Sequence, residues 1–463
     1  MSRIRKKERL RAQPPVELVI DRLSHEGRGI AHHADGKLVF VDGALPGERV
    51  SARVTFSNRK FDEAAVLDVF EAAADRVAPP CAHFGVCGGC SLQHMAPAAQ
   101  IAFKQQVLAD QLRHFGGLQP GTWLPPLTHG HASYRRKARL GVRYVIKKET
   151  LMVGFRERQG SYLADIHACT VMDQRLGQSI TPLRQLIAGL VARDHIAQIE
   201  VAAGDELAGY QDVALVFRHL VPLEPQDVQA LTGFCADRGW QCYLQPGGYD
   251  TVHRVWPKEG RDRLYYRLPD FDAPGRPGEG LTMAFHPNDF TQVNAGINQR
   301  MVKLALDLLD PQPTDRVLDL FCGLGNFTLP LATRAREVVG VEGVATMVER
   351  GYENARANGL TNVSFYAQDL TRDFSTQPWA GLGFDRILID PARSGALEVI
   401  PHLARFGAHR VVYVSCNPAT LARDAGEMAK AGYDLLQAGV MDMFTHTTHV
   451  ESIAVFEKRR PAG

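Results

Sequence analysis

The sequence lacks the apolar stretches that mark membrane insertion or secretion. No apolar run reaches the roughly 20 residues needed to cross a bilayer. The basic N-terminus at residues 1–11 is not followed by the apolar core of a secretory signal. We therefore predict a cytoplasmic protein that makes no membrane contact.

Neither sign of charge is in marked excess. The chain has 53 Lys and Arg residues against 51 Asp and Glu residues. A protein that binds nucleic acid through its whole surface usually carries a strong basic excess. Any contact with RNA or DNA must therefore come from local basic patches.

Eight cysteines in 463 residues are too few for a disulfide scaffold, and several are clustered. Cys81, Cys87 and Cys90 lie on one short segment, and two glycines between the last two allow a tight loop. Three thiolates from one loop with a distant fourth, here Cys169, are typical of iron–sulfur ligation. A four-cysteine structural zinc site is the alternative. The spacing is not the Cys-x₃-Cys-x₂-Cys of radical enzymes, so we do not expect radical chemistry.

A glycine turn in the C-terminal half has the pattern of a ligand-binding loop. The apolar run 317–321 contains one acid, Asp319, and is followed by Gly323, Gly325 and a predicted helix start at 326–332. A strand, a glycine turn and a helix form the entry to a nucleotide-binding α/β unit. Glycines there let the backbone approach a ligand closely.

The ligand of this loop is predicted to be a nucleoside without a pyrophosphate. Thr328 stands where the dinucleotide fingerprint has its third glycine, which a pyrophosphate requires for close helix approach. Glu342 ends the next apolar strand, where a carboxylate can accept both ribose hydroxyls. We therefore expect S-adenosylmethionine rather than NAD, with an ordinary strand–helix turn as the competing interpretation.

Composition and periodicity divide the chain into four parts. Residues 1–13 form a basic tail, and residues 14–74 contain short strands separated by glycine turns, as in a small barrel of oligonucleotide-binding type. Residues 75–285 hold the cysteine loop, a helix from Pro97 and a mixed α+β region. Residues 286–463 alternate seven strands with helices, which predicts a doubly wound α/β sheet.

A basic cluster in the middle of the chain is a candidate RNA contact. Tyr134 is followed by Arg135, Arg136, Lys137 and Arg139. Phosphate contacts supply much of the affinity for nucleic acid, and such a cluster suits them. A charge run is also typical of a solvated face, so the residues alone leave both interpretations open.

Three chemically reactive side chains stand at predicted strand ends. Asp390 ends one strand, Cys416 ends the next, and Glu451 begins the last. Ligands of doubly wound sheets bind beyond the carboxyl ends of the strands. A cysteine there is a candidate nucleophile, although a buried packing cysteine is the commoner case.

A cysteine, a carboxylate and a methyl donor in one cleft together indicate methylation of a pyrimidine. Carbon 5 of a pyrimidine becomes nucleophilic only after a thiolate adds at carbon 6. It can then attack the sulfonium methyl, and a base removes the proton from carbon 5. Cys416 would be the nucleophile and Glu451 the base, with the target nucleotide flipped out of its stack.

Several motifs spread over nearly the whole chain resemble those of the bacterial RNA uracil-C5 methyltransferases, most closely the branch that acts on 23S ribosomal RNA. The motifs are Cys81-x₅-Cys87-Gly-Gly-Cys90 with Cys169, Phe285-x-Pro287-x-x-Phe290-x-Gln292-x-Asn294, Leu318-Asp-Leu-Phe-Cys-Gly323, Asp390-Pro-Ala-Arg393, Ser415-Cys-Asn-Pro418 and His449-Val-Glu451.

The resemblance implies a fold and a set of site residues. The fold is a Rossmann-like S-adenosylmethionine-dependent methyltransferase domain, preceded by an OB-like TRAM barrel and a mixed α+β iron–sulfur and RNA-binding domain. Its implied [4Fe–4S] ligands are Cys81, Cys87, Cys90 and Cys169. Its implied cofactor contacts are Gln292, Phe321, Asn326, Glu342, Asp369 and Asp390. The implied catalytic pair is Cys416 and Glu451, and Arg135, Arg136, Lys137 and Arg139 become expected RNA contacts.

Two other functions remain open from the sequence. Within the class, the substrate could be transfer RNA or a second ribosomal site instead of the expected 23S RNA. The expected barrel and cysteine cluster argue against the bacterial transfer RNA enzyme, which lacks both. From another class, the chain could be a non-catalytic iron–sulfur RNA-binding protein, against which intact Cys416 and Glu451 argue. The resemblance also implies a monomer.

Overall fold

The computed structural model describes residue 10 and residues 12–207 and 212–459. The chain divides into two compact units. The first comprises residues 1–104, 156–164 and 444–448, and the second comprises the rest. Most of the basic tail expected at residues 1–13 lies outside the described residues. Among the described helices, none is both long and apolar enough for a membrane span.

The first unit contains a six-stranded sheet of short strands, in the order β1-β5-β6-β4-β3-β2. Its strands are β1 (Val16–Val19), β2 (Arg22–Leu23), β3 (Gly29–His32), β4 (Leu38–Asp42), β5 (Arg49–Ser57) and β6 (Phe61–Glu71). Alternate side chains of these strands form a small apolar core that includes Val39, Val41 and Val50. This confirms the small N-terminal barrel that the glycine turns predict.

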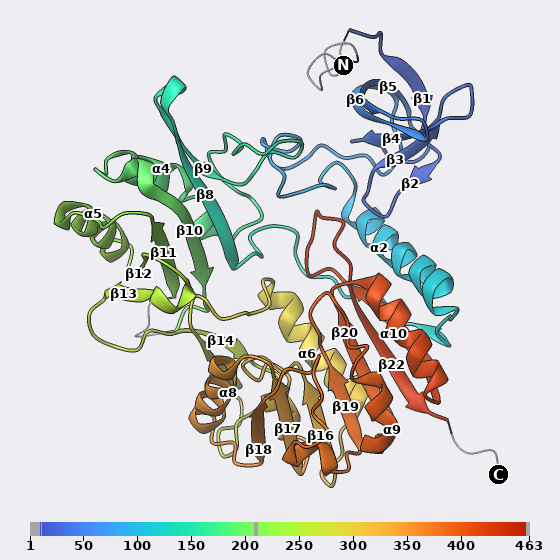
Figure 1. Ribbon diagram of the computed structural model, residues 1–463, viewed down its shortest axis with the longest axis vertical. Helices are drawn as coiled ribbons and strands as arrows, with labels where there is room; N and C mark the ends of the chain where they lie inside the picture. Colours follow the sequence, from blue (N-terminus) through green and yellow to red (C-terminus); the bar gives the residue numbers. More distant parts are fainter. Residues whose placement is uncertain (1–9, 11, 208–211, 460–463) are drawn as a thin grey trace. The chain divides into compact units, whose positions relative to one another are not determined.

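Helix α2 (Pro97–Gln111) lies between the strands of the two sheets in sequence. The second unit contains a six-stranded sheet in the order β13-β12-β11-β10-β8-β9. Its strands are β8 (Lys137–Val145), β9 (Thr150–Gly154), β10 (Ile196–Ala203), β11 (Val213–His219), β12 (Gln241–Gln245) and β13 (His253–Trp256). The helices α4 (Ile180–Ala188) and α5 (Pro225–Ala236) lie on one side of it (Figure 1). Leu183, Leu215 and Leu231 belong to the apolar core between them.

A second, eight-stranded sheet carries the glycine loop, in the order β18-β17-β16-β19-β20-β22-β21-β7. Its strands are β7 (Thr122–Trp123), β16 (Arg316–Leu320), β17 (Glu337–Glu342), β18 (Val363–Ala367), β19 (Arg386–Ile389), β20 (Arg410–Ser415), β21 (Tyr433–Met441) and β22 (Glu451–Lys458). The hairpin of β14 (Leu264–Leu268) and β15 (Leu281–Phe285) precedes it in the chain.

Helices cover both faces of this sheet, as a doubly wound fold requires. They are α6 (Ala295–Leu309), α7 (Thr328–Ala332), α8 (Ala345–Ala357), α9 (Leu403–Phe406) and α10 (Pro418–Lys430). In Figure 1, α9 and α10 lie in front of the sheet and α6 is seen behind it. The seven predicted strands are confirmed, and the edge strand β7 was not predicted.

The strand order reverses beside β16, which is the next strand of the sheet in sequence after the edge strand β7. The chain runs from β16 outward to β17 and β18, then returns to β19 on the other side of β16. All these strands are parallel, so their carboxyl ends lie at one edge. Ligands of such sheets bind at that edge, next to the reversal point.

Candidate active site

The loop after β16 is shaped by residues with positive backbone φ angles. Gly323 and Gly325 have φ values of 56° and 95°, and Phe321 has 65°. A Cβ at Gly325 would lie 2.5 Å from Leu329 Cδ1. Phe321 is not a glycine, and a non-glycine residue in this conformation stores strain, which is common at functional sites.

The threonine that replaces the third glycine has a role of its own in this structure. The Thr328 hydroxyl donates to Asp319 Oδ2 at 2.6 Å, and both side chains are fully buried. The other carboxyl oxygen of Asp319 has no hydrogen-bond partner. Burial, with the Asp390 and Glu342 carboxylates nearby, raises the pKa of Asp319 to about 8. Thr328 therefore fixes a carboxyl beneath the loop instead of admitting a pyrophosphate.

A small pocket of about 40 Å³ lies over this loop. Four of the six predicted cofactor residues line it, namely Gln292, Phe321, Asn326 and Asp390. Asp390 follows β19, and its N–H donates to the carbonyl of Leu320 at 3.2 Å. Burial raises the pKa of Asp390 to about 7.

The other two predicted cofactor residues lie beside the pocket. Glu342 ends β17, and its carboxylate accepts from the N–H groups of Gly323 at 3.1 Å and Val344 at 2.9 Å. Asp369 lies two residues beyond β18, is exposed, and accepts from both the N–H and the hydroxyl of Thr371. It is not among the residues that line the pocket.

The Asn326 side chain is already engaged inside the protein. Its Oδ1 accepts from the Tyr266 hydroxyl at 2.8 Å and from Asn298 Nδ2 at 3.0 Å. Its Nδ2 donates back to Asn298 Oδ1 at 2.9 Å. Only one N–H of Asn326 is left for a ligand, so a large part of its role here is to hold the glycine loop to α6.

Cys416 and Glu451 are brought together by the register of two antiparallel strands. Ser415 of β20 pairs with Ser452 of β22, and the Ser452 hydroxyl donates to the Ser415 carbonyl at 3.1 Å. Cys416 follows Ser415, and Glu451 precedes Ser452. Since the two strands are antiparallel, the next position of the ladder sets Cys416 opposite Glu451. Besides burial, the carboxylate of Glu451 is accordingly one of the groups that raise the pKa of Cys416.

The surroundings of Cys416 favour the neutral thiol in the free protein. Burial, followed by the carboxylates of Glu451 and Asp390, raises the pKa of Cys416 to about 11. The guanidinium of Arg393 acts in the opposite direction and lowers it. Arg393 is held in place: its Nη2 lies 3.0 Å from His449 Nδ1, and its carbonyl accepts from Asn417 Nδ2.

The side chains of the four predicted cluster ligands are all partly exposed. Around Cys87 the backbone is tightly packed: the Gly88 N–H donates to the carbonyl of Arg156 at 2.8 Å, and the Gly89 N–H donates to Cys87 Sγ at 3.4 Å. In the part of the chain that the structure describes, no three His, Cys, Asp or Glu side chains are grouped so as to hold a metal ion.

The four residues of the basic cluster do not form one exposed patch. Arg139 is the most open, with 57% of its side chain exposed, and it pairs with Glu200 at 3.1 Å. Arg136 pairs with Asp205. Arg135 is half-buried and lies in backbone bridges to Met172 and Asn294. The Lys137 ammonium is turned inward and donates to a backbone carbonyl.

Two family models match the chain. The model described as tRNA (Uracil-5-)-methyltransferase matches residues 278–459, and the TRAM domain model matches residues 16–67. The chain is 57% identical to the 23S rRNA (uracil(1939)-C(5))-methyltransferase RlmD of Alcanivorax borkumensis, over 97% of this chain and 98% of that protein. The chain belongs to the RlmD family. The RlmD of Alkalilimnicola ehrlichii is 55% identical, over 98% of this chain and 99% of that protein. The chain is an S-adenosylmethionine-dependent methyltransferase.

A solved structure has the same fold as this RlmD family member. The tRNA (uracil-54, C5)-methyltransferase of Pyrococcus abyssi, in complex with S-adenosyl-L-homocysteine, aligns over 95% of this chain and 100% of its own, with a TM-score of 0.72 and 22% identity. The architecture by itself therefore does not separate enzymes that modify ribosomal RNA from enzymes that modify transfer RNA.

Some residues of the site were not predicted from the sequence. Tyr266 and Thr291 line the pocket, Arg393 acts on the pKa of Cys416, and His449 contacts Arg393. The last two belong to motifs that were recognised, which could have indicated them. Tyr266 carried no such signal, because its role depends on the fold of a distant hairpin.

Proposed function

We propose that this chain transfers the methyl group of S-adenosylmethionine to carbon 5 of one uridine in 23S ribosomal RNA, forming 5-methyluridine. The relatives' names give the position as uracil 1939, and we propose the corresponding uridine for this chain. The strongest support is the strand register that sets a cysteine opposite a carboxylate beside the cofactor pocket. We also propose that the chain acts as a monomer in the cytoplasm.

In this proposal the cofactor lies over the glycine loop. Gln292, Phe321, Asn326 and Asp390 contact it from the pocket wall. Each oxygen of Glu342 already accepts one backbone N–H and retains a lone pair for a ribose hydroxyl. The Asp369 carboxylate already accepts the N–H and the hydroxyl of Thr371 on one oxygen and pairs with Arg372 at 3.2 Å through the other. We therefore assign Asp369 the weakest of the cofactor contacts.

Cys416 is the proposed nucleophile. Its sulfur forms a bond to carbon 6 of the flipped uracil, and the thiol proton leaves as that bond forms. The electrons of the carbon 5–carbon 6 double bond move to the ring as an enolate, so carbon 5 becomes nucleophilic. Carbon 5 then displaces S-adenosylhomocysteine from the methyl group. The positive charge of Arg393 lowers the pKa of Cys416 and therefore favours the Cys416 thiolate.

Glu451 is the proposed base that completes the reaction. After methyl transfer, carbon 5 carries both a methyl group and a proton, and the carboxylate removes that proton. The released electron pair reforms the double bond and expels the Cys416 thiolate. The net change is replacement of one hydrogen by a methyl group, with release of one proton and S-adenosylhomocysteine. Glu451 is only 3% exposed, which keeps bulk water away from it.

We also propose that Cys81, Cys87, Cys90 and Cys169 bind a [4Fe–4S] cluster. The donor set supports this, since cysteine sulfurs are the usual ligands of such clusters and all four side chains are partly exposed. The Gly89 N–H that donates to Cys87 Sγ is the kind of hydrogen bond that tunes cluster sulfurs. A four-cysteine zinc site is the alternative. No step of the reaction uses this metal, and we assign it a structural role.

The RNA surface of the second unit is the last part of the proposal. Arg135, Arg136 and Arg139 supply its positive charge, and Arg139 has the most exposed side chain of the three. Phosphate contacts from such residues set the register of the RNA, while the pocket selects the base.

A methyl-transfer assay with labelled S-adenosylmethionine tests the function. Unmodified 23S RNA and unmodified transfer RNA are each incubated with the protein, and the nucleosides are separated. We expect labelled 5-methyluridine from 23S RNA only. Label in transfer RNA alone would keep the chemistry and replace the substrate. The absence of label in both would overturn the function in favour of a non-catalytic RNA-binding protein.

A further inference from the structure

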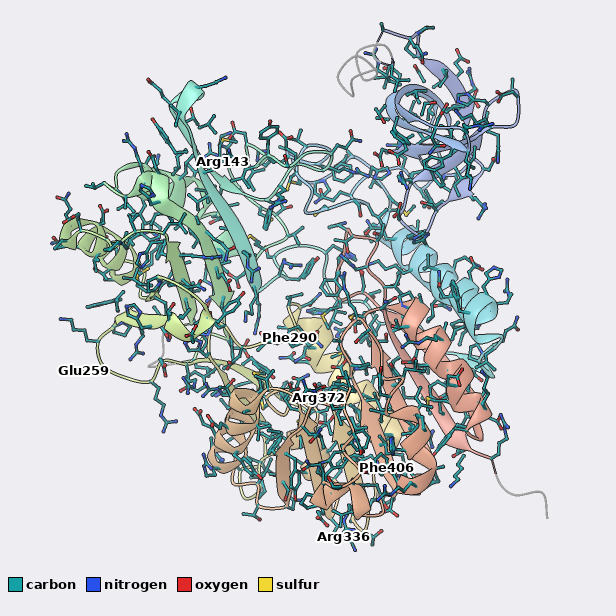
Figure 2. All side chains as sticks on the ribbon, viewed as in Figure 1. Arg143, Glu259, Phe290, Arg336, Arg372 and Phe406 are labelled. Atoms are coloured by element: carbon teal, nitrogen blue, oxygen red, sulfur yellow. The ribbon has the colours of Figure 1, made fainter. Side chains whose placement is uncertain are left out.

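The loop of residues 286–294 connects β15 to α6 and carries pocket residues on a surface segment. Phe290 lines the cofactor pocket although 70% of it is exposed, and Gln292 lies two residues further along. In Figure 2, Phe290 lies at the end of α6 nearest the carboxyl edge of the sheet. A side chain this exposed receives little support from packing, so its position depends on how the loop backbone is held.

Asp289 holds the loop backbone in a closed turn immediately before Phe290. The Asp289 N–H donates to the carbonyl of His286 at 2.8 Å. The Asp289 carboxylate accepts from the His286 N–H at 2.7 Å. Asp289 thus bonds both the N–H and the carbonyl of His286. The chain therefore leaves the turn at Phe290 in a fixed direction.

Two cations from separate elements hold Asp289. Arg350 of α8 donates through Nε to the Asp289 carboxylate at 3.1 Å, and each of these two side chains is only 11% exposed. Lys137 of β8 donates through Nζ to the Asp289 carbonyl. The carboxylate and the carbonyl of one residue are thus fixed from two sides. We call Lys137, Asp289 and Arg350 the loop clamp.

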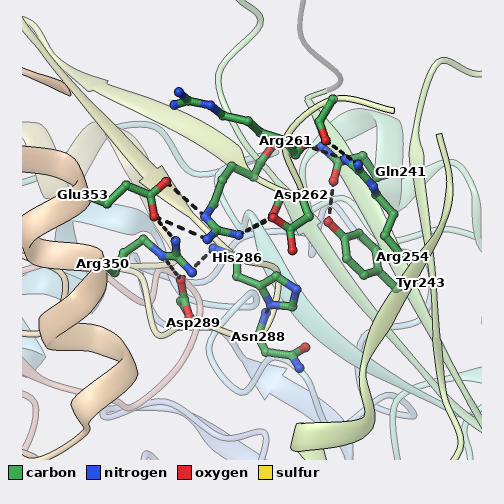
Figure 3. Close-up of polar contacts among 12 residues, drawn as sticks. Gln241, Tyr243, Arg254, Arg261, Asp262, His286, Asn288, Asp289, Arg350 and Glu353 are labelled. Atoms are coloured by element: carbon green, nitrogen blue, oxygen red, sulfur yellow. Dashed lines mark hydrogen bonds and ion pairs between the residues drawn. The ribbon is translucent and has the colours of Figure 1, made fainter. Parts of the chain in front are cut away.

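The arginine of the loop clamp is itself held by a further ion pair. Glu353, one turn along α8, pairs with Arg350 and also with Arg263 at 3.3 Å. Figure 3 shows this chain of contacts from Asp289 through Arg350 to Glu353. Burial makes charge-assisted hydrogen bonds of this kind stronger than exposed ones. Arg350 therefore has little freedom to leave Asp289.

Lys137 is poorly placed to contact an RNA phosphate. Its ammonium is committed to the Asp289 carbonyl and lies 5.9 Å from the centre of the Phe285 ring. Burial lowers the pKa of Lys137 to about 8, as expected for an ammonium withdrawn from water. Its neighbour Arg139, in contrast, is more than half exposed.

We propose that the loop clamp positions Phe290 and Gln292 for methyl transfer, and that Lys137 serves in it as a positioning residue rather than as an RNA contact. The inference rests on the proposed function, since Phe290 and Gln292 line the site of that reaction. It reassigns one of the four residues expected to bind RNA. Small displacements of positioned groups reduce rates by about 10- to 100-fold, which sets the expected size of the effect.

Hydrogen exchange and single-turnover kinetics on full-length variants test the loop clamp. Lys137→Met removes the bond to the Asp289 carbonyl and Asp289→Ala removes both contacts of the carboxylate, while Lys137→Arg and Arg350→Lys keep a donor and should recover part of the rate. We expect the amides of residues 286–292 to exchange faster in the first two variants, and the single-turnover rate to fall by about tenfold or more. Arg336→Met is the matched control, because Arg336 is exposed at the opposite end of the sheet (Figure 2).

The salt dependence of RNA affinity separates positioning from phosphate binding. Losing one phosphate contact reduces the slope of log Kd against log salt by about 1. We expect an unchanged slope for Lys137→Met and a reduced slope for Arg139→Met. A reduced slope for Lys137→Met would overturn the reassignment of Lys137.

The remaining outcomes are also decisive. Unchanged loop exchange and an unchanged rate in Asp289→Ala, which removes both contacts of the carboxylate, would overturn the loop clamp. If the wild-type protein transfers no methyl group to 23S RNA, the proposed function fails, while faster exchange of residues 286–292 would still show that the contacts hold the loop. The two failures are therefore distinguishable.

Discussion

Ser415 and Ser452 face each other in the last ladder pair before the active site, and the Ser452 hydroxyl donates to the Ser415 carbonyl. This bond fixes the register of β20 and β22 at their last pair, next to Cys416 and Glu451. A slip of one residue would turn Glu451 to the other face of the sheet. The relation between the proposed nucleophile and the proposed base is therefore a property of strand pairing, which is more rigid than a loop.

Replacing Cys416 should abolish catalysis without unfolding the protein. Cys416→Ala removes the sulfur that forms the covalent bond, and we expect methyl transfer to fall by at least about 10³-fold, in keeping with the loss of a nucleophile. Cofactor binding should persist, because Cys416 is not among the pocket-lining residues. Calorimetric titration with S-adenosylhomocysteine and a methylation assay measure the two effects. Retention of full activity would exclude covalent catalysis by Cys416.

Replacing Glu451 with glutamine should stop the reaction after methyl transfer. The base that removes the carbon 5 proton is then missing, so the methylated RNA remains bonded to Cys416. Denaturing gel electrophoresis with labelled cofactor should reveal a labelled protein–RNA adduct. Burial and then the Glu451 carboxylate raise the pKa of Cys416, so the neutral glutamine should also lower that pKa below about 11. Normal turnover without an adduct would refute the role of Glu451.

Cofactor affinity should rise with pH. Burial raises the pKa of Asp319 to about 8 and that of Asp390 to about 7, from an ordinary value of 3.8. S-adenosylmethionine brings positive charge, which favours the ionised carboxylates, so binding should release protons. We expect Kd to fall as the pH rises from about 6 to 9, measured by calorimetry in buffers of different ionisation heat. S-adenosylhomocysteine, which lacks the sulfonium charge, is the control.

The same two carboxyls predict the pH dependence of stability. A carboxyl whose pKa is raised by folding binds more protons in the folded state, so the free protein loses stability as the pH rises from 3.8 toward about 8. The melting temperature of the wild type should therefore fall more steeply with pH over this interval than that of Asp390→Asn, which has one of the two carboxyls removed. Equal slopes for the two proteins would contradict the assignment of a buried, neutral carboxyl to Asp390.

Removing one cluster ligand should remove iron. Cys87→Ser in protein purified without oxygen should lose most of its iron and sulfide, and the surrounding loop should become more susceptible to protease, since metal binding is coupled to folding. Elemental analysis and limited proteolysis provide the readouts. Zinc in the wild-type protein, in place of iron, would establish the alternative four-cysteine zinc site.

Local sequence patterns were sufficient to predict the strands and the reactive side chains at their ends. The apolar run with Asp319, the two glycines and Glu342 are neighbours in sequence, so their grouping follows from one strand–turn–helix unit. Likewise, Cys416 and Glu451 each stand next to a strand. Predicting that these two residues lie close together requires, in addition, only the order of the strands in the sheet.

The contacts that the sequence did not indicate involve partners far apart in the chain. Lys137 reads as part of a basic run, but the loop that it holds begins almost 150 residues later. Asn326 reads as a ligand contact, but Tyr266 and Asn298 occupy most of its hydrogen-bonding groups. The edge strand β7 has two residues, too few to show a periodic pattern. These features depend on tertiary packing, which no local spacing records.

The most direct test of the account uses 23S RNA in which uridine is replaced by 5-fluorouridine. Fluorine at carbon 5 cannot be removed by a base, so the reaction should stop with Cys416 bonded to carbon 6 and the methyl group already on carbon 5. Mass spectrometry of the digested complex should find RNA and methyl attached to the peptide containing Cys416. An intact protein with no adduct, in a preparation that methylates ordinary 23S RNA, would contradict the covalent mechanism.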